Sequence, residues 1–131
     1  MEIYISEEAI IAEIQREFQE AYPYLKLEFY RQPHEIGQGS RVEEKIAPDT
    51  PIEDIRMMHT FGWVDISHQR TAADLEHDFR HAFGLSVQVL RKSGDLWLET
   101  TKTDNWTLAQ LNEEGKLAES HIFYYPEEPA E

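Results

Sequence analysis

An internal repeat limits the folds open to this chain more than any other feature. Residues 2–6, EIYIS, align with residues 63–67, WVDIS, at an offset of 61. After a one-residue gap, residues 25–32, LKLEFYRQ, align with residues 85–92, LSVQVLRK. Chance similarity between amphipathic segments is the alternative, but the shared order and matched apolar positions favour a repeat. The matched pairs are Ile14 with Leu75, Phe18 with Phe79, Ala21 with Ala82, Tyr22 with Phe83, Leu25 with Leu85, Leu27 with Val87, and Phe29 with Val89.

Each copy predicts a strand, a helix and a second strand. Apolar residues recur four apart in the middle of each copy, which is the spacing of one helical face. The flanking segments alternate apolar and polar residues, as half-buried strands do. Thr71, three residues ahead of Asp74, resembles a capping box for the second helix. Pro23 and Gly84 follow the two predicted helices as stop signals.

Two βαβ units in tandem predict an α+β fold of the ferredoxin-like plait type. That fold has one antiparallel four-stranded sheet with both helices on one face. The length of 131 residues indicates a single domain, residues 1–131. Within it we expect repeat one at 2–32, an insert at 33–61, repeat two at 62–92, and a hairpin, helix and tail at 93–131.

The C-terminal part adds elements to the repeat. Ser93 and Gly94 predict a tight hairpin turn, so residues 95–101 become an added strand. A short helix is expected around 106–113, with Gly115 just beyond its end. Residues 121–125, HIFYY, read as a last strand or a packing arm.

The insert at 33–61 divides into two parts. Its first part is polar and rich in turn formers, which predicts a loop. In its second part Ile52, Ile55 and either Met57 or Met58 are spaced like one face of a short helix.

Composition excludes several functions. The absence of cysteine rules out disulfides, thiolate catalysis and cysteine-based zinc sites. The net charge of −14 is spread evenly along the chain and would repel phosphate backbones and anionic membranes. We therefore expect no nucleic-acid binding through phosphates. A basic protein partner, which an acidic mimic would bind, is one interpretation of the charge, and a solvated surface is the other.

No targeting or cofactor-binding segment stands out. No apolar run approaches the ~20 residues that span a bilayer, and the first residues lack the basic region of a signal peptide. A cytoplasmic location and no membrane contact are therefore expected. No cofactor is predicted, because the patterns of zincins, P-loops and nucleophile elbows are absent.

Strand alternation predicts an open sheet face that is aromatic and polar. An apolar face of this size is rarely left exposed to solvent unless it binds something. It could be covered by the insert and the C-terminal residues, by a second subunit in a homodimer, or by a small ligand. The candidate interface or ligand residues are Tyr4, Glu28, Tyr30, Trp63, Asp65, Gln88, Leu90 and Trp97.

No catalytic residue is assigned. If the face forms a pocket with the insert, Glu28 and Asp65 are the candidate acid–base groups, because shelter by aromatic rings raises the pKa of a carboxyl. His77 and His81 stand four apart on one helix face and could chelate a divalent metal. The matching positions of the first helix are also charged, which favours a plain solvent face.

Residues 83–108, FGLSVQVLRKSGDLWLETTKTDNWTL, resemble a segment of small uncharacterised bacterial proteins. The resemblance covers about a fifth of the chain and implies no activity. The leading hypothesis is a non-enzymatic interaction domain that self-associates through its aromatic sheet face. The alternatives are a small-molecule-binding protein or minor enzyme, and an acidic mimic that binds a basic protein.

Overall fold

The computed structural model describes residues 1–31 and 45–124, with side chains described as far as residue 119. Residues 33–44 of the predicted loop, Tyr125 and the acidic tail lie outside this range. The elements in order are β1 (Glu2–Ile5), α1 (Ile11–Ala21), β2 (Leu25–Tyr30), the 3-10 helix η2 (Ile52–Asp54), β3 (Gly62–Asp65), α2 (Ala72–Phe83), β4 (Ser86–Ser93), β5 (Leu96–Glu99) and α3 (Leu108–Tyr124).

The strands form two antiparallel sheets, and this is the main difference from the predicted fold. The described part of the chain pairs β1 with β3 in one sheet and orders β2, β4 and β5 in the other. The α+β class is therefore confirmed, whereas the single four-stranded sheet is not what these strands form. Alternation shows which side chains of a strand turn inward, but it does not say which strand is the neighbour.

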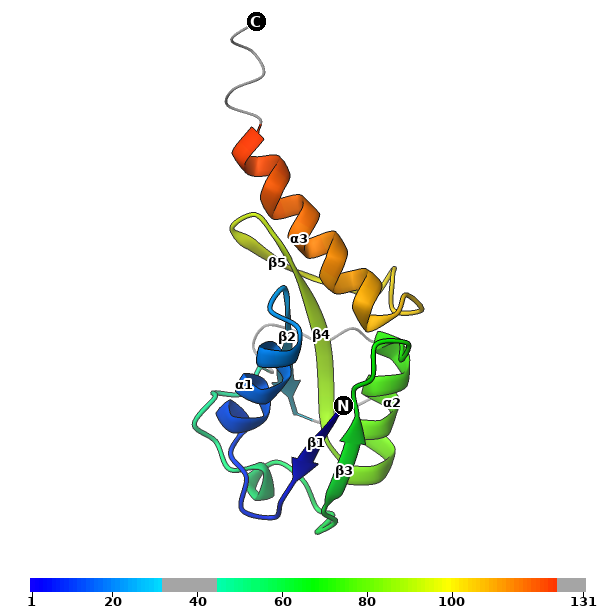
Figure 1. Ribbon diagram of the computed structural model, residues 1–131. Helices are drawn as coiled ribbons and strands as arrows, with labels where there is room; N and C mark the ends of the chain where they lie inside the picture. The colour runs from blue at the N-terminus through cyan, green and yellow to red at the C-terminus, as the bar shows by residue number, and fades with distance from the viewer. Residues whose placement is uncertain (32–44, 125–131) are drawn as a thin grey trace, which may run out of the picture.

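One core joins both sheets to all three helices. The apolar sides of β1 and β3, represented by Ile3 and Val64, belong to the same buried cluster as Leu27 and Val89 of the other sheet. The helix α1 contacts both β1 and β2, and α2 contacts both β3 and β4. Figure 1 shows the two helices flanking the strands, so they do not share one face of a single sheet as expected.

The helix ends follow the sequence signals closely. At the start of α2 the Asp74 amide donates to the Thr71 hydroxyl at 3.0 Å, and the Thr71 amide donates to the Asp74 carboxylate at 3.2 Å. This reciprocal pair is the predicted capping box. The helix α2 ends at Phe83 with Gly84 as its C-cap, and α1 ends at Ala21, two residues before Pro23.

The added hairpin forms, but the helix after it is longer than predicted. Gly94 adopts a φ of +62° at the turn between β4 and β5, a conformation that side chains disfavour. The helix α3 has 17 residues and includes 121–124, so the short helix and the last strand were both wrong. Gly115 lies inside α3, where a Cβ would stand only 2.8 Å from the Tyr24 Cβ. Close packing, and not helix termination, explains this glycine.

The second part of the insert is less helical than predicted. A 3-10 helix of three residues replaces the short α-helix. Ile52 is buried and Ile55 is partly buried, whereas Met57 is 95% exposed. The spacing of the isoleucines indicated the buried side correctly, but the methionines lie beyond the end of the helical turn.

Among the described residues no helix combines the length and the apolar character needed to cross a membrane.

Candidate functional site

The eight residues of the predicted face divide between the two sheets. Tyr4, Trp63 and Asp65 belong to β1 and β3, and the other five belong to β2, β4 and β5. Tyr4 and Trp63 are 40% and 62% exposed. The face is therefore not one surface, and four of its members are already buried within the chain. These four are Glu28, Tyr30, Gln88 and Leu90.

The first surface is the outer side of β1 and β3, which we call the β1–β3 patch and define by Glu2, Tyr4, Trp63 and Asp65. Tyr4 lies directly opposite Trp63 across the strands, and Glu2 lies directly opposite Asp65. The two rings meet edge to face with centroids 5.0 Å apart. Like charges opposite each other destabilise a sheet, so this carboxylate pair needs an explanation.

Asp65 remains ionised in this position. The side chain and backbone amide of Ser67 both donate to Asp65 Oδ1, and these hydrogen bonds lower the pKa of the carboxyl. The positive charges of Arg70 and of the amino terminus lower the pKa further. The expected rise in the pKa of Asp65 was therefore wrong, because the neighbouring serine donates to the charged form.

More apolar surface lies in the segment that leads into β3. Met57 is 95% exposed and Phe61 is 62% exposed, and Met58 is also exposed. Exposed methionines are common on surfaces that bind partners of varied shape. Together with Tyr4 and Trp63, these side chains are half of the large apolar residues that the described surface exposes.

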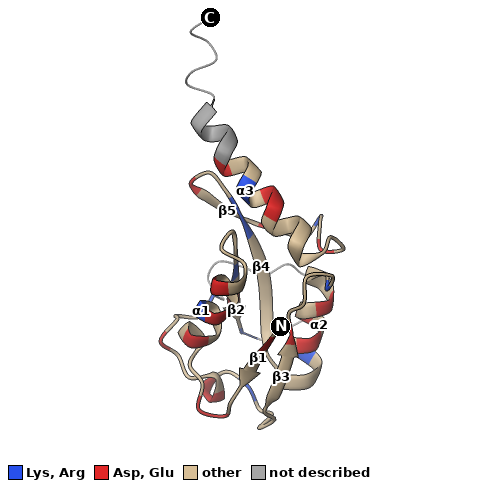
Figure 2. Ribbon diagram, viewed as in Figure 1, with Lys and Arg blue, Asp and Glu red and all other residues tan. Residues whose placement is uncertain are grey.

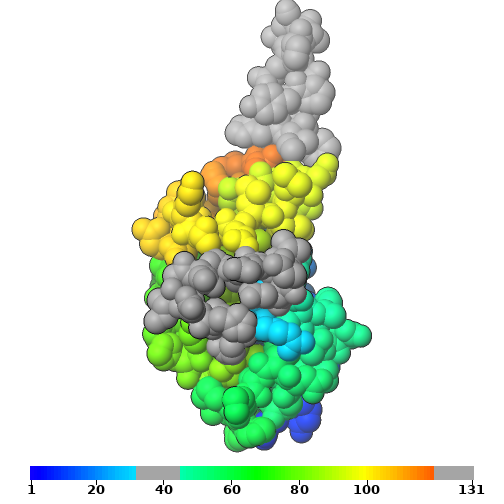
Figure 3. All heavy atoms as spheres, turned by 180° about the vertical axis from the view of Figure 1, so that it is seen from behind, coloured from blue at the N-terminus to red at the C-terminus, as the bar shows by residue number. Residues whose placement is uncertain are grey.

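The second surface is a pocket on the sheet of β2, β4 and β5, which we call the lysine pocket. It has a volume of about 190 Å³. Lys45 comes from the insert, and the other described lining residues come from the strands of this sheet. Figure 3 shows residues 45–60 and the β5 hairpin on the same side of the molecule. The lining residues are Lys26, Glu28, Tyr30, Lys45, Leu90, Trp97 and Glu99.

Glu28 is the centre of the polar contacts in this pocket. Its Oε2 lies 3.2 Å from the Lys26 ammonium and 3.0 Å from the Lys45 ammonium. Tyr30 is buried beside it, and desolvation raises the pKa of the phenol to about 12, with contributions from Glu99 and Glu28. The phenol is therefore a neutral hydrogen-bond donor at physiological pH.

Trp97, the aromatic residue of the added strand, lies under two cations. The Lys26 Nζ lies 4.9 Å from the centroid of its ring, and the Lys92 Nζ lies 5.5 Å from it. Both distances are within the range of a cation–π interaction. Trp97 is partly buried, and it faces these two cations on the wall of the pocket.

Sequence reasoning missed Glu76. Its Oε2 accepts from the Val89 amide at 3.0 Å and lies 3.3 Å from the Gln88 amide nitrogen. Burial raises the pKa of Glu76 to about 7, although the Val89 hydrogen bond opposes this. Its position in the sequence could have indicated this contact. Glu76 lies between Leu75 and Phe79 and so borders the apolar face of the helix.

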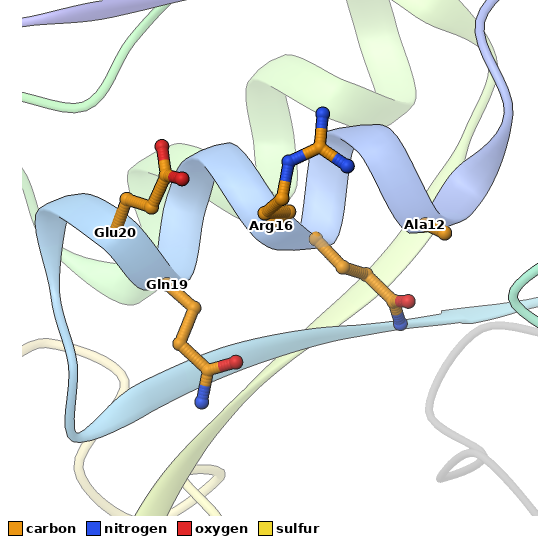
Figure 4. Close-up of a pocket in the computed structure, with 5 residues that line it drawn as sticks. Ala12, Arg16, Gln19 and Glu20 are labelled. Atoms are coloured by element: carbon orange, nitrogen blue, oxygen red, sulfur yellow. The ribbon is translucent and has the colours of Figure 1, made fainter.

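Another hollow lies along α1 and has a volume of about 350 Å³. Figure 4 shows Gln19 directed toward β2, whereas Arg16 and Glu20 are directed away from it. The described residues that line it come from one helix, so no constellation from several elements converges there. They are Ala12, Gln15, Arg16, Gln19 and Glu20.

The predicted histidine pair is present but offers two ligands at most. The His77 and His81 rings stack with centroids 4.0 Å apart. Among the described residues, one group of three could supply ligands to a metal ion, because their ligand atoms lie within 4.8 Å of one another. The three residues are Glu7, Glu53 and His59. Glu53 is already bonded there to Arg56 at 2.8 Å and to His59 at 2.7 Å, so its carboxylate is in use.

Comparisons with known proteins found no matching family model, no matching curated protein and no matching solved structure.

Proposed function

We propose that the protein is an interaction domain that binds a basic segment of a partner protein through the β1–β3 patch. One observation carries the proposal: a pair of aromatic rings lies next to a pair of carboxylates on the outer side of a two-stranded sheet. A lysine or arginine side chain placed there would meet carboxylates and aromatic faces together. Both attract a cation.

The carboxylates of the patch are available to such a cation. Ser67 bonds Asp65 at Oδ1, and none of the described residues donates to Oδ2. Glu2 likewise forms no ion pair with a described residue. The net charge of −14 adds a long-range attraction for a basic partner. A bound cation would also remove the repulsion between Glu2 and Asp65.

Self-association through the same patch is the competing function. Two copies packed face to face would bring two Glu2 and two Asp65 side chains together without a cation. Two chains of net charge −14 would also repel each other. The proposal therefore predicts a monomer at micromolar concentration in sedimentation velocity. A stable dimer that dissociates on the Trp63→Ala substitution would favour the homodimer instead.

Binding can be followed through Trp63 itself. In the double variant Trp97→Phe/Trp106→Phe, Trp63 is the remaining tryptophan. A capped peptide that alternates lysine and leucine serves as the probe. We expect a saturable change in fluorescence that weakens as salt rises, because salt screens the charges. An otherwise identical glutamate–leucine peptide should give no change.

Matched variants separate the patch from the general acidity of the chain. Glu2→Gln combined with Asp65→Asn should weaken binding about tenfold, the loss of two charge contacts partly exposed to water. Glu13→Gln combined with Glu17→Gln removes the same charge from exposed positions of α1 and should leave binding unchanged. Equal losses in the two double variants would contradict the proposal.

We also propose that the fold is a duplicated βαβ unit related to the ferredoxin-like plait. The strand register supports this. Adding or subtracting the offset of 61 exchanges the pair Glu2–Asp65 with the pair Tyr4–Trp63. An offset of 60 likewise exchanges Leu27–Val89 with Phe29–Val87.

These exchanges are what a pseudo-two-fold axis between Ile3 and Val64, and between Glu28 and Gln88, would produce. An experimental structure with another register in either pair of strands would contradict the duplication.

A further inference from the structure

Three of the five lysines of the chain gather around the lysine pocket. The five are Lys26, Lys45, Lys92, Lys102 and Lys116. Lys26 and Lys45 line the pocket, and Lys92 lies over the ring of Trp97, which also lines it. Figure 2 shows basic residues where β4 approaches β5, while acidic residues are spread over the helices.

Glu28 orders these lysines. A single oxygen of its buried carboxylate lies 3.2 Å from one ammonium and 3.0 Å from the other. The Gln15 side chain lies 3.5 Å from the second oxygen and so approaches Glu28 from α1. Glu28 therefore holds two ammonium groups close together. Without the carboxylate between them, the two positive charges would repel each other. A preorganised pair of cations costs less to bind than a flexible pair.

The described residues around the pocket sum to a charge that differs in sign from that of the chain. Among the described residues, the lining carries two lysines, Lys26 and Lys45, and two glutamates, Glu28 and Glu99. Adding Lys92 gives a sum of three minus two, or +1, whereas the chain sums to −14. A cationic ligand would have to displace lysines already paired with Glu28. An anion could contact both ammonium groups. Each ammonium has three N–H donors, and its pairing with one oxygen of Glu28 leaves the other donors available to the anion.

The other lining residues that the structure describes are apolar or neutral. Leu90 is buried, and Trp97 supplies a flat ring. No described residue forms a hydrogen bond with the Tyr30 hydroxyl, although Tyr30 is only 6% exposed. The hydroxyl can therefore donate to water or to a ligand in the pocket. The pocket thus offers one neutral donor and two apolar walls beside the cations.

We propose that the lysine pocket binds a small organic anion with a flat apolar body, such as an aromatic carboxylate. Lys45 and Lys26 bind the anionic group, Tyr30 donates a hydrogen bond, and Leu90 and Trp97 contact the apolar body. The volume of about 190 Å³ lies below the ~300 Å³ at which drug-sized pockets begin, so the ligand is small. This site belongs to the other sheet and is independent of the β1–β3 patch.

Three probes distinguish the parts of this proposal. Benzoate supplies the charge and the ring, benzamide the ring without the charge, and inorganic phosphate the charge without the ring. In ¹H–¹⁵N spectra of the full chain, benzoate should shift the indole N–H signal of Trp97 saturably, with a dissociation constant of about 1 mM or lower. Benzamide and phosphate should bind at least about tenfold more weakly. Equal binding of benzamide, or no saturable shift with benzoate, overturns the proposal.

Variants with little effect on folding complete the test. Lys45 is partly exposed, so Lys45→Gln should keep the fold and weaken benzoate binding about tenfold. Lys102→Gln, at an exposed lysine outside the pocket, is the matched control and should leave the affinity unchanged. Glu99→Gln removes a repelling charge and should strengthen binding. Unchanged affinity in Lys45→Gln, or weaker binding in Glu99→Gln, contradicts the assignment.

Discussion

Glu76 of α2 accepts a hydrogen bond of 3.0 Å from the backbone amide of Val89 on β4. The contact closes the part of the β4 edge that β5 leaves unpaired, since β5 pairs only from Leu90 onward. A partly buried carboxyl at a strand edge makes the stability of the fold depend on pH. Desolvation raises the pKa of Glu76 from 4.5 to about 7, mainly because its charged form is shielded from water.

The pH dependence has a definite sign. Between pH 4.5 and about 7 the folded chain keeps a proton on Glu76 that the unfolded chain has lost. The free energy of unfolding should therefore fall as pH rises through this window, by about 2 kcal/mol from this group. Glu76→Gln should flatten the decline in urea titrations at pH 5 and pH 7.5. Glu17→Gln is the control, and an equal slope in wild type and Glu76→Gln would refute the assignment.

Gly115→Ala should destabilise the packing of α3. The added Cβ would stand 2.8 Å from the Tyr24 Cβ and 3.1 Å from the Tyr24 carbonyl oxygen. Overpacking of this kind costs about 1–3 kcal/mol, although alanine is the better helix former. Urea denaturation of Gly115→Ala and of Glu113→Ala, an exposed position of the same helix, measures the effect. A more stable Gly115→Ala would mean that α3 does not pack against Tyr24.

Thr71→Ala should remove half of the capping box at the start of α2. The Asp74 amide would lose its partner at 3.0 Å. Loss of such a cap costs about 1 kcal/mol. Thr71→Ser keeps the hydroxyl and should retain most of the stability in the same thermal denaturation experiment. If both variants lose equal stability, the hydroxyl does not cap α2.

Glu2→Gln should stabilise the free protein while weakening its binding to a basic probe. Glu2 and Asp65 lie directly opposite each other, so removing one charge relieves repulsion in the unbound sheet. We expect the melting midpoint to rise by about 1–2 °C. Calorimetry at low salt measures this, and the difference should vanish at high salt. A lower midpoint would show that Glu2 has a stabilising partner.

The sequence predicted local structure better than it predicted pairing. The strand–helix–strand order of β1, α1 and β2 and of β3, α2 and β4 was predicted, and Thr71, Asp74 and Gly84 marked the ends of α2. Each of these features depends on residues close together in the chain. The division into two sheets depends on which strands meet, and period-two alternation is identical for either partner.

The candidate site was predicted in part for the same reason. Glu28, Tyr30, Leu90 and Trp97 were expected on one face, and they do line one pocket. Tyr4 and Trp63 share their alternation pattern but belong to the other sheet. Lys45 and Glu76 were missed, because a lysine in an insert and a glutamate on a helix look like solvated residues until the fold brings them to a strand.

The most direct test of the central claim maps where a basic peptide binds. Backbone ¹H–¹⁵N signals are followed during a titration with the lysine–leucine peptide at physiological salt, where general attraction to an acidic surface is screened. The account predicts that the largest shifts fall on Glu2–Ile5 and Gly62–Asp65, the strands that carry Tyr4 and Trp63. Shifts spread evenly over the acidic helices, or centred on β5 and α3, would contradict it.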